Sequence, residues 1–217
     1  MENSFYKSTG LSLILGSVLA IITMVFHPTG GSLEHIIDIA KPLTYTHALG
    51  IFSLPFMLFG FYGMTQKLLE KWKFSVLAFI IISFGLLAAM MAAVLNGLAL
   101  PYFLTRYTVD IELNSSVIKP IVQYGFALNK ALDYVFIVAF CTSITIYSIL
   151  IITHQKLQKW IGYLGFVILF LAIIGAITEF TFTDLVGFRI VVLSVTIWVL
   201  FSGTSLIKSK NNFYGKK

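Results

Sequence analysis

Two histidines and two carboxylates are the residues of this sequence whose types and positions best suit chemistry. His27 and His47 are twenty residues apart, and each lies near the end of a long apolar segment. Facing imidazoles are typical ligands of a transition-metal ion or a haem iron. Asp133 and Glu179 lie near the ends of two other apolar segments, where either carboxylate could add a metal ligand or act as a general base. We therefore hypothesise a divalent metal or haem site on His27 and His47.

Plainer interpretations of the same histidines stay open. The spacing is not itself a metal motif, and the sequence contains no HExxH, CxxC or HxH pattern. A histidine at the end of an apolar helix can cap that helix or lie among lipid headgroups. Without a metal, a protonated His47 could pair with Asp133 or Glu179 and act as a pH-sensitive clasp. A serine nucleophile has little support, because Ser and Thr in apolar helices usually bond to the helix backbone.

Polar residues collect near one end of each apolar segment, the end that we predict to face outside. Ionisable groups within a membrane are energetically expensive, and they usually face a bundle interior or a water-filled cavity. Long side chains have a simple alternative, since Lys and Arg can extend to the headgroups. We predict a small-ligand cavity at the outer end, lined by His47, Asn96, Asn129, Lys130, Asp133, Glu179 and Arg189.

The composition indicates a lipid environment for these residues. Of the 217 residues, 58% are hydrophobic and 11% are charged, whereas a soluble domain has about 25% charged residues. The charged residues are too few to cover a globule of this size. In such a chain, lysines that face anionic lipid explain the net charge of +6. We therefore expect membrane lipid, and no nucleic acid, among its partners.

Six apolar segments are long enough to cross a membrane as helices. A spanning helix needs about 20 apolar residues, because each adds 1.5 Å across a hydrocarbon core about 30 Å thick. The segments do not alternate polar and apolar residues as barrel strands do. We predict an all-α polytopic membrane protein, a six-transmembrane-helix bundle in a single domain. The predicted spans are 8–26, 43–64, 74–100, 131–153, 160–182 and 185–207, with an amphipathic stretch before the fourth, from near Ile121.

The distribution of basic residues predicts the orientation of the bundle. With the N-terminus inside, ten of the 15 Lys and Arg residues lie on the inner side and five on the outer side. Basic residues in short loops favour the cytoplasmic side. Trp72 and Trp160 lie at inner helix ends, where aromatic residues anchor helices at the interface. We predict a plasma-membrane protein with both termini in the cytoplasm.

Several stretches of the chain carry a family resemblance. Val94–Gly97, Ala127–Leu132 and Trp160–Gly165, together with Ile197 and Trp198, resemble a bacterial family of small six-helix membrane proteins. The resemblance implies a compact six-helix bundle, and it implies no activity or substrate. Asn96 and Asn129 belong to the resembling stretches, which makes them natural positions to test.

Three functions are compatible with these observations. The first is a protein that binds a small ligand in an outer cavity, for transport or sensing. The second is a metal- or haem-dependent membrane enzyme that uses His27 and His47. The third is a subunit or assembly factor of a membrane complex. The polar residues favour the first function, and the lack of a polar path through the inner half argues against transport of a polar substrate.

The predicted orientation can be tested with reporter fusions. Fusions after Lys73, Lys159 and Lys217 are expected to report a cytoplasmic location, because these positions follow basic inner segments. Fusions within residues 28–42 and 101–120 are expected to report an external location. An external signal after Lys73 would contradict the assignment.

Overall fold

The computed structural model describes residues 2–69, 73–107 and 115–209, and every element within these residues is a helix. Trp72, which contributed to the predicted orientation, lies outside the described residues. Six helices are long and apolar enough to cross a membrane. The predicted all-α six-helix bundle is confirmed, and the chain is an integral membrane protein.

In chain order the elements are α1 (Glu2–Phe26), α2 (Leu33–Asp38), α3 (Ala40–Leu69), α4 (Phe74–Ala93), the π-helix η1 (Val94–Ala99), α5 (Leu100–Leu104), the 3-10 turn η2 (Thr105–Tyr107), α6 (Ser115–His154), α7 (Lys159–Ile177) and α8 (Leu185–Lys208).

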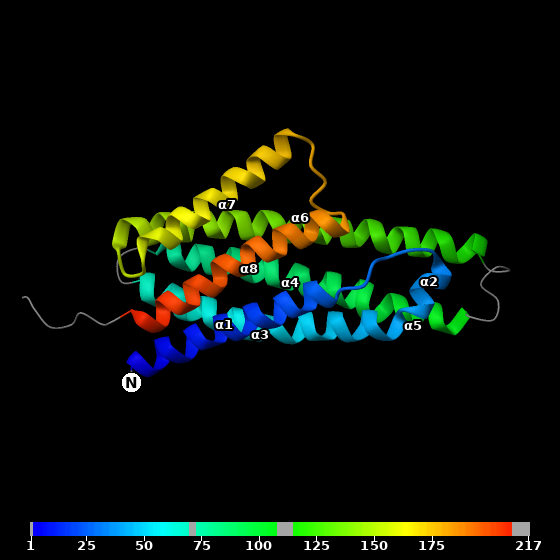
Figure 1. The fold of residues 1–217 in the computed structure, drawn as a ribbon, viewed down its shortest axis with the longest axis horizontal. Helices are drawn as coiled ribbons and strands as arrows, with labels where there is room; N and C mark the ends of the chain where they lie inside the picture. The colour runs from blue at the N-terminus through cyan, green and yellow to red at the C-terminus, as the bar shows by residue number, and fades with distance from the viewer. Residues whose placement is uncertain (1, 70–72, 108–114, 210–217) are drawn as a thin grey trace, which may run out of the picture.

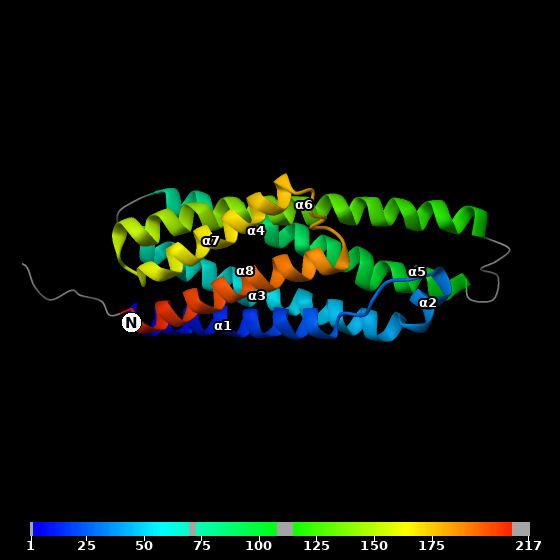
Figure 2. The same ribbon diagram turned by 45° about the horizontal axis from the view of Figure 1, so that its top comes forward.

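Neighbouring helices of the bundle follow the order α8, α1, α3, α4, α6, α7. The helix α1 packs along both α3 and α8, and α4 packs along α6 (Figure 1, Figure 2). Few positions of α6 and α7 approach α8, so the ring is least closed on that side. The start of α1 and the end of α8 lie at the same end of the bundle (Figure 1). We call the opposite end, which carries α2 and α5, the distal end.

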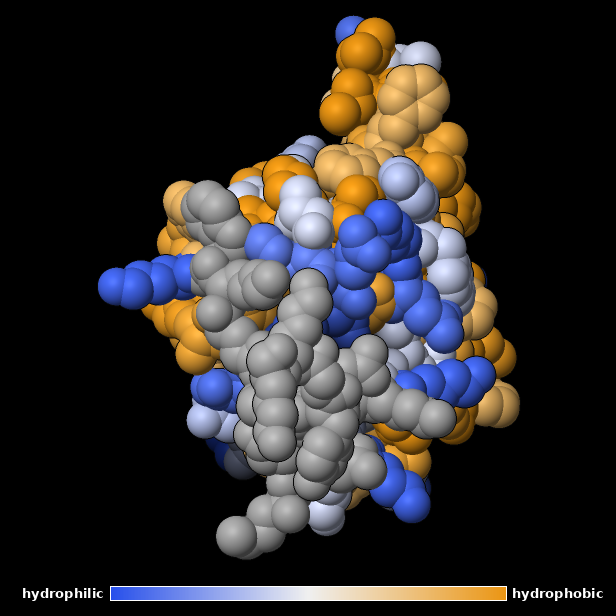
Figure 3. Space-filling model, turned by 90° about the vertical axis from the view of Figure 1, so that its left-hand side faces the viewer, coloured by the Kyte–Doolittle hydropathy of each residue, from blue (hydrophilic) through white to orange (hydrophobic). Residues whose placement is uncertain are grey.

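Hydrophobic residues cover the sides of the bundle. Large apolar side chains such as Leu15, Phe84 and Phe170 are 44%, 63% and 62% exposed, as lipid-facing residues of a spanning helix are. Hydrophilic residues instead gather on the end face at the start of α1 and the end of α8 (Figure 3). This division is the one expected of a bundle whose sides contact lipid and whose ends contact water.

Glycines allow α1 to pack closely between α3 and α8. A Cβ atom on Gly203 of α8 would lie 2.8 Å from the carbonyl oxygen of Gly10 in α1. A Cβ atom on Gly60 of α3 would overlap Leu13 of α1. Small residues let spanning helices approach to backbone contact, and Leu13 is fully buried as a result.

Large side chains fill the half of the bundle nearest the termini. We call this cluster the proximal core, and its largest fully buried members are Leu13, Phe61, Met64, Tyr147 and Trp198. The Tyr147 hydroxyl shares a 2.8 Å hydrogen bond with Thr65 of α3. The Trp198 indole donates to the carbonyl oxygen of Ile161 in α7 at 2.9 Å. These two hydrogen bonds join different helices in a region where lipid offers no partner.

Several helices differ from the predicted spans: α1 and α3 extend past theirs, to Glu2 and to Leu69, and α6 and α7 differ in ways that affect the site. The fourth predicted span begins at Ala131, whereas α6 begins at Ser115 and has 40 residues. At 1.5 Å per residue α6 is about 60 Å long, so its first half extends past a hydrocarbon core of about 30 Å.

The fifth predicted span reaches Phe182, but α7 ends at Ile177. Phe180 donates its backbone N–H to Gly175 at 2.8 Å, and Glu179 donates to Ala176 at 3.4 Å with a φ of 57°. These two bonds form a Schellman motif, which ends a helix with a left-handed residue. The apolar pattern continues past this point, so hydropathy alone extends the helix too far.

A matched pair of glycine substitutions tests the packing of α1. Gly203→Ala is expected to destabilise the protein by about 1–3 kcal/mol, since backbone atoms of Gly10 cannot move aside for the new methyl group. Gly125→Ala is the control, because no atom lies within 4 Å of a Cβ built there and alanine favours helix. Thermal unfolding in detergent should show a lower midpoint for Gly203→Ala only. Equal midpoints for the two variants would refute the close contact.

Candidate functional site

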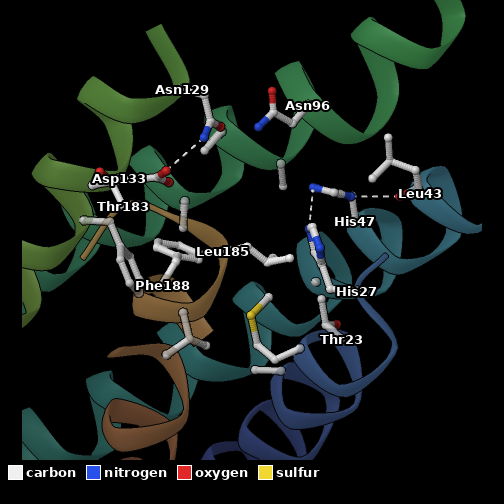
Figure 4. A pocket seen from close by; sticks show the side chains of 18 of the residues that line it. Thr23, His27, Leu43, His47, Asn96, Asn129, Asp133, Thr183, Leu185 and Phe188 are labelled. Carbon is white, nitrogen blue, oxygen red and sulfur yellow. Dashed lines mark hydrogen bonds between the residues drawn. The ribbon is translucent and has the colours of Figure 1, made fainter. Parts of the chain in front are cut away.

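A cavity of about 310 Å³ lies among the helices of the distal half. Residues of α1, α3, α4, α6 and α8 line it, and none of its described lining residues belongs to α7. Its inner wall is apolar and includes Leu54, Met57, Phe136, Phe140 and Val195. Its polar lining consists mainly of Thr23, His27, His47, Asn96, Asn129, Asp133, Thr183 and Asp184. The cavity therefore combines an apolar interior with polar groups toward the distal end (Figure 4).

The two histidines contact each other at the cavity wall. Their Nε2 atoms are 3.3 Å apart, and their ring centroids are 4.7 Å apart at an interplanar angle of 61°. The Nδ1 of His27 lies 2.9 Å from the carbonyl oxygen of Pro28. The Nδ1 of His47 lies 2.8 Å from the carbonyl oxygen of Leu43. Because a carbonyl oxygen only accepts hydrogen bonds, each Nδ1 carries the hydrogen and each Nε2 faces the other ring.

The ends of two helices bring the rings together. The helix α1 ends at Phe26, since Pro28 has no N–H to continue it and disfavours helical backbone at His27. His47 lies in the second turn of α3 and is 8% exposed. Arg189 of α8 donates to the carbonyl oxygen of His27 at 2.5 Å. Burial lowers the pKa of His27, and the charge of Arg189 lowers it further, against the hydrogen bond to Pro28. These effects favour the neutral imidazole.

A π-helical turn presents Asn96 to the cavity. Pro101 would clash with the carbonyl group four residues before it in a regular α-helix. Within η1 the N–H of Leu100 instead bonds to the carbonyl oxygen of Leu95, five residues back. A Cβ atom on Gly97 would overlap the side chain of His47. Gly97 thus allows the widened turn to press against His47, and π-turns of this kind are frequent at functional sites.

A second polar group lies across the cavity from the histidines. Asn129 donates to the carboxyl oxygen Oδ2 of Asp133 at 2.8 Å along one face of α6. Asp133 is 5% exposed. Thr183 also lines the cavity (Figure 4), and its buried hydroxyl oxygen has no hydrogen-bond partner among the described residues. The cavity therefore contains a buried carboxyl group that accepts from one amide, and a buried hydroxyl group that lacks a partner in the described part of the chain.

Not all the predicted site residues meet at the cavity. His27, His47, Asn96, Asn129 and Asp133 line it, whereas Lys130, Glu179 and Arg189 do not. Lys130 and Glu179 are exposed, and Arg189 donates to the backbone carbonyl oxygen of His27. The Schellman motif at the end of α7 places Glu179 outside the cavity.

The histidines do not gather the carboxylates expected beside them. Among residues 2–69, 73–107 and 115–209, no three His, Cys, Asp or Glu side chains are arranged to hold a metal ion. The ring nitrogens of His47 contact His27 and Leu43, so the pairing of His47 with Asp133 or Glu179 is not formed. A haem iron between two histidines would need them on opposite faces of the porphyrin, and rings 4.7 Å apart leave no space for that macrocycle.

Sequence reasoning missed Gly97 and Thr183. The signal for Gly97 was an Asn-Gly pair followed by Pro101 inside an apolar segment, a pattern that indicates an irregular turn. The signal for Thr183 was weaker, since it lies in a short loop whose path depends on where α7 ends.

Comparisons with known proteins add no function to this geometry. Searches against protein-family models, curated proteins and solved structures found no match to the chain.

Gly97→Ala tests the contact between η1 and the histidine pair. The new methyl group is expected to displace the His47 ring, because the Cβ position is already occupied by that side chain. Imidazole ¹⁵N NMR signals of His27 and His47 should both shift in the variant. Gly30→Ala is the control, since nothing lies within 4 Å of its Cβ position. Unchanged imidazole signals in Gly97→Ala would contradict the contact.

Proposed function

We propose that this membrane protein binds a small amphipathic molecule in the distal cavity. A volume of about 310 Å³ lies at the lower end of the range for small-molecule sites, roughly 300–1,000 Å³. Such sites are mostly apolar and contain a few convergent polar groups. The apolar wall at Met57, Phe136 and Phe140 suits a hydrocarbon body. The polar wall suits a head group that forms hydrogen bonds.

The observation that carries the proposal is the buried carboxyl group of Asp133. A carboxyl group inside a spanning helix is expensive unless it is paired, and Asn129 is the donor that the described residues supply. Thr183 also lines the cavity, and its buried hydroxyl has no hydrogen-bond partner among the described residues. A ligand whose head group donates hydrogen bonds, such as a primary amine, would give the Asp133 carboxyl group a further partner. We therefore assign the head group to this wall.

The shape of the cavity favours binding or sensing over transport. The proximal core closes the space below the cavity, and Phe61, Tyr147 and Trp198 within it have no exposed surface. A transported molecule would need this core to separate. With the predicted orientation, the cavity faces the outer side of the membrane, where a bound molecule can be sensed without crossing the bilayer.

Binding of three ligands of one chain length tests the proposal. Native mass spectrometry of the protein in nanodiscs would compare n-octylamine, n-octanol and n-octanoate. Octylamine is expected to bind most tightly. Asp133→Asn should weaken octylamine binding by about 10- to 100-fold, because a hydrogen bond to a charged group contributes roughly 1.5–3 kcal/mol, and should change octanol binding little.

Two further variants complete this experiment. Glu179→Gln removes an exposed carboxylate outside the cavity and should leave octylamine binding unchanged. Ala93→Phe, on the α4 wall of the cavity, should abolish binding of all three ligands by filling the space. Octylamine binding that survives both Asp133→Asn and Ala93→Phe would refute the site. The site would also be refuted if none of the three ligands bound the wild-type protein.

A further inference from the structure

We propose that His27 and His47 bind one divalent ion of the late first transition row, of the Zn²⁺ class, at the cavity wall. The inference goes beyond the amphipathic-ligand site, since it rests on the histidine geometry and on no property of that ligand. It also differs from a closed structural metal site, because the protein supplies two ligands and the cavity supplies the others.

The first observation is which ring nitrogens of His27 and His47 carry a hydrogen atom. Each Nδ1 lies within 2.9 Å of a backbone carbonyl oxygen, of Pro28 for His27 and of Leu43 for His47. Both Nδ1 atoms must therefore donate, and in neutral imidazole the other nitrogen is then an acceptor. Each Nε2 atom consequently carries a lone pair, and the two atoms are 3.3 Å apart. Two lone pairs repel at this distance unless a positively charged species lies at both of them.

The separation of the two Nε2 atoms fits a tetrahedral metal ion. Zn²⁺ binds imidazole nitrogen at about 2.0–2.1 Å, and two such bonds at a tetrahedral angle place the nitrogens roughly 3.3–3.4 Å apart. The observed separation is 3.3 Å. An ion on the cavity side of the pair therefore requires little movement of either ring.

The surroundings of the rings match those of metal-binding histidines. A ligating histidine usually donates its second ring N–H to a carbonyl or carboxylate oxygen, which fixes the tautomer and the ring orientation. Both rings have this carbonyl partner, and Gly97 packs against the side chain of His47. The chain thus holds both Nε2 lone pairs in place before an ion arrives.

The remaining coordination positions open onto the cavity. No third His, Cys, Asp or Glu of the described residues joins the pair, and the guanidinium of Arg189 donates to the carbonyl oxygen of His27. This positive charge disfavours an additional cation, so an anion among the remaining ligands would offset it. Water, hydroxide or an anionic group of a bound molecule would fill the two remaining positions, one more than in catalytic zinc sites, where three protein ligands leave one position open.

Cobalt titration of the intact protein tests the inference. The protein would be purified through a tag without histidine, freed of metal with a chelator, and titrated with Co²⁺ in nanodiscs. We expect one equivalent to bind with the visible absorption of a tetrahedral ion, and Zn²⁺ to displace it. Electron paramagnetic resonance with Cu²⁺ in place of Co²⁺ should show coupling to two imidazole nitrogens.

Substitutions locate the ion. The double variant His27→Gln, His47→Gln should lose the cobalt absorption, whereas His35→Gln in α2 should retain it, and unfolding midpoints would verify that both variants fold. Absence of saturable binding in the wild-type protein would overturn the inference, and so would equal binding by the double variant. Octylamine binding measured with chelator present reports the amphipathic-ligand site separately, so the failure of one site is distinguishable from the failure of the other.

Discussion

The absence of water from the hydrocarbon core constrains every other feature of this protein. Backbone groups of a spanning segment must pair within their own helix, and buried polar side chains must pair inside the bundle. In the proximal core one such pair, Tyr147 and Thr65, joins two helices. In the distal half they surround a cavity in which several groups have room for a partner from outside. The need to pair polar groups in the absence of water is thus met by packing in the proximal half, whereas the distal half contains a cavity that can accept a ligand.

The sequence predicted the features of this architecture that depend only on distance along a helix axis. Apolar length sets the number of spanning helices, because the rise per residue and the membrane thickness are constant. Depth along a helix follows from the same rise, so residues near the distal ends, such as His47, Asn96 and Asp133, could be expected at one level. Their polarity inside apolar segments then indicated an interior surface. The structure places these three residues, with His27 and Asn129, around one cavity.

The sequence did not predict the direction in which a side chain points around its helix, or the residue at which local backbone hydrogen bonds end a helix. Lys130 is one residue from Asn129, yet it faces away because adjacent helical residues point about 100° apart. Glu179 follows an apolar run, but two backbone hydrogen bonds end the helix before it. Arg189 has the expected depth, but it contacts a carbonyl group of another helix instead of the cavity. Hydropathy describes how apolar a segment is. It does not describe the helix rotation, the backbone hydrogen bonds or the contact between helices that place these three residues.

The π-turn at residues 94–99 makes the length of this segment as important as its composition. A π-turn holds one residue more than an α-helical turn, so it is equivalent to a single-residue insertion in a regular helix. Deleting one residue there would convert the π-turn into a regular helical turn, so Asn96 and Gly97 could not both keep their places at the cavity and against His47. The helix α5, which packs against α2 at the distal end, would keep its place only with the loss of one of these two positions. We expect the interval from Asn96 to Pro101 to tolerate changes of side chain far better than any insertion or deletion.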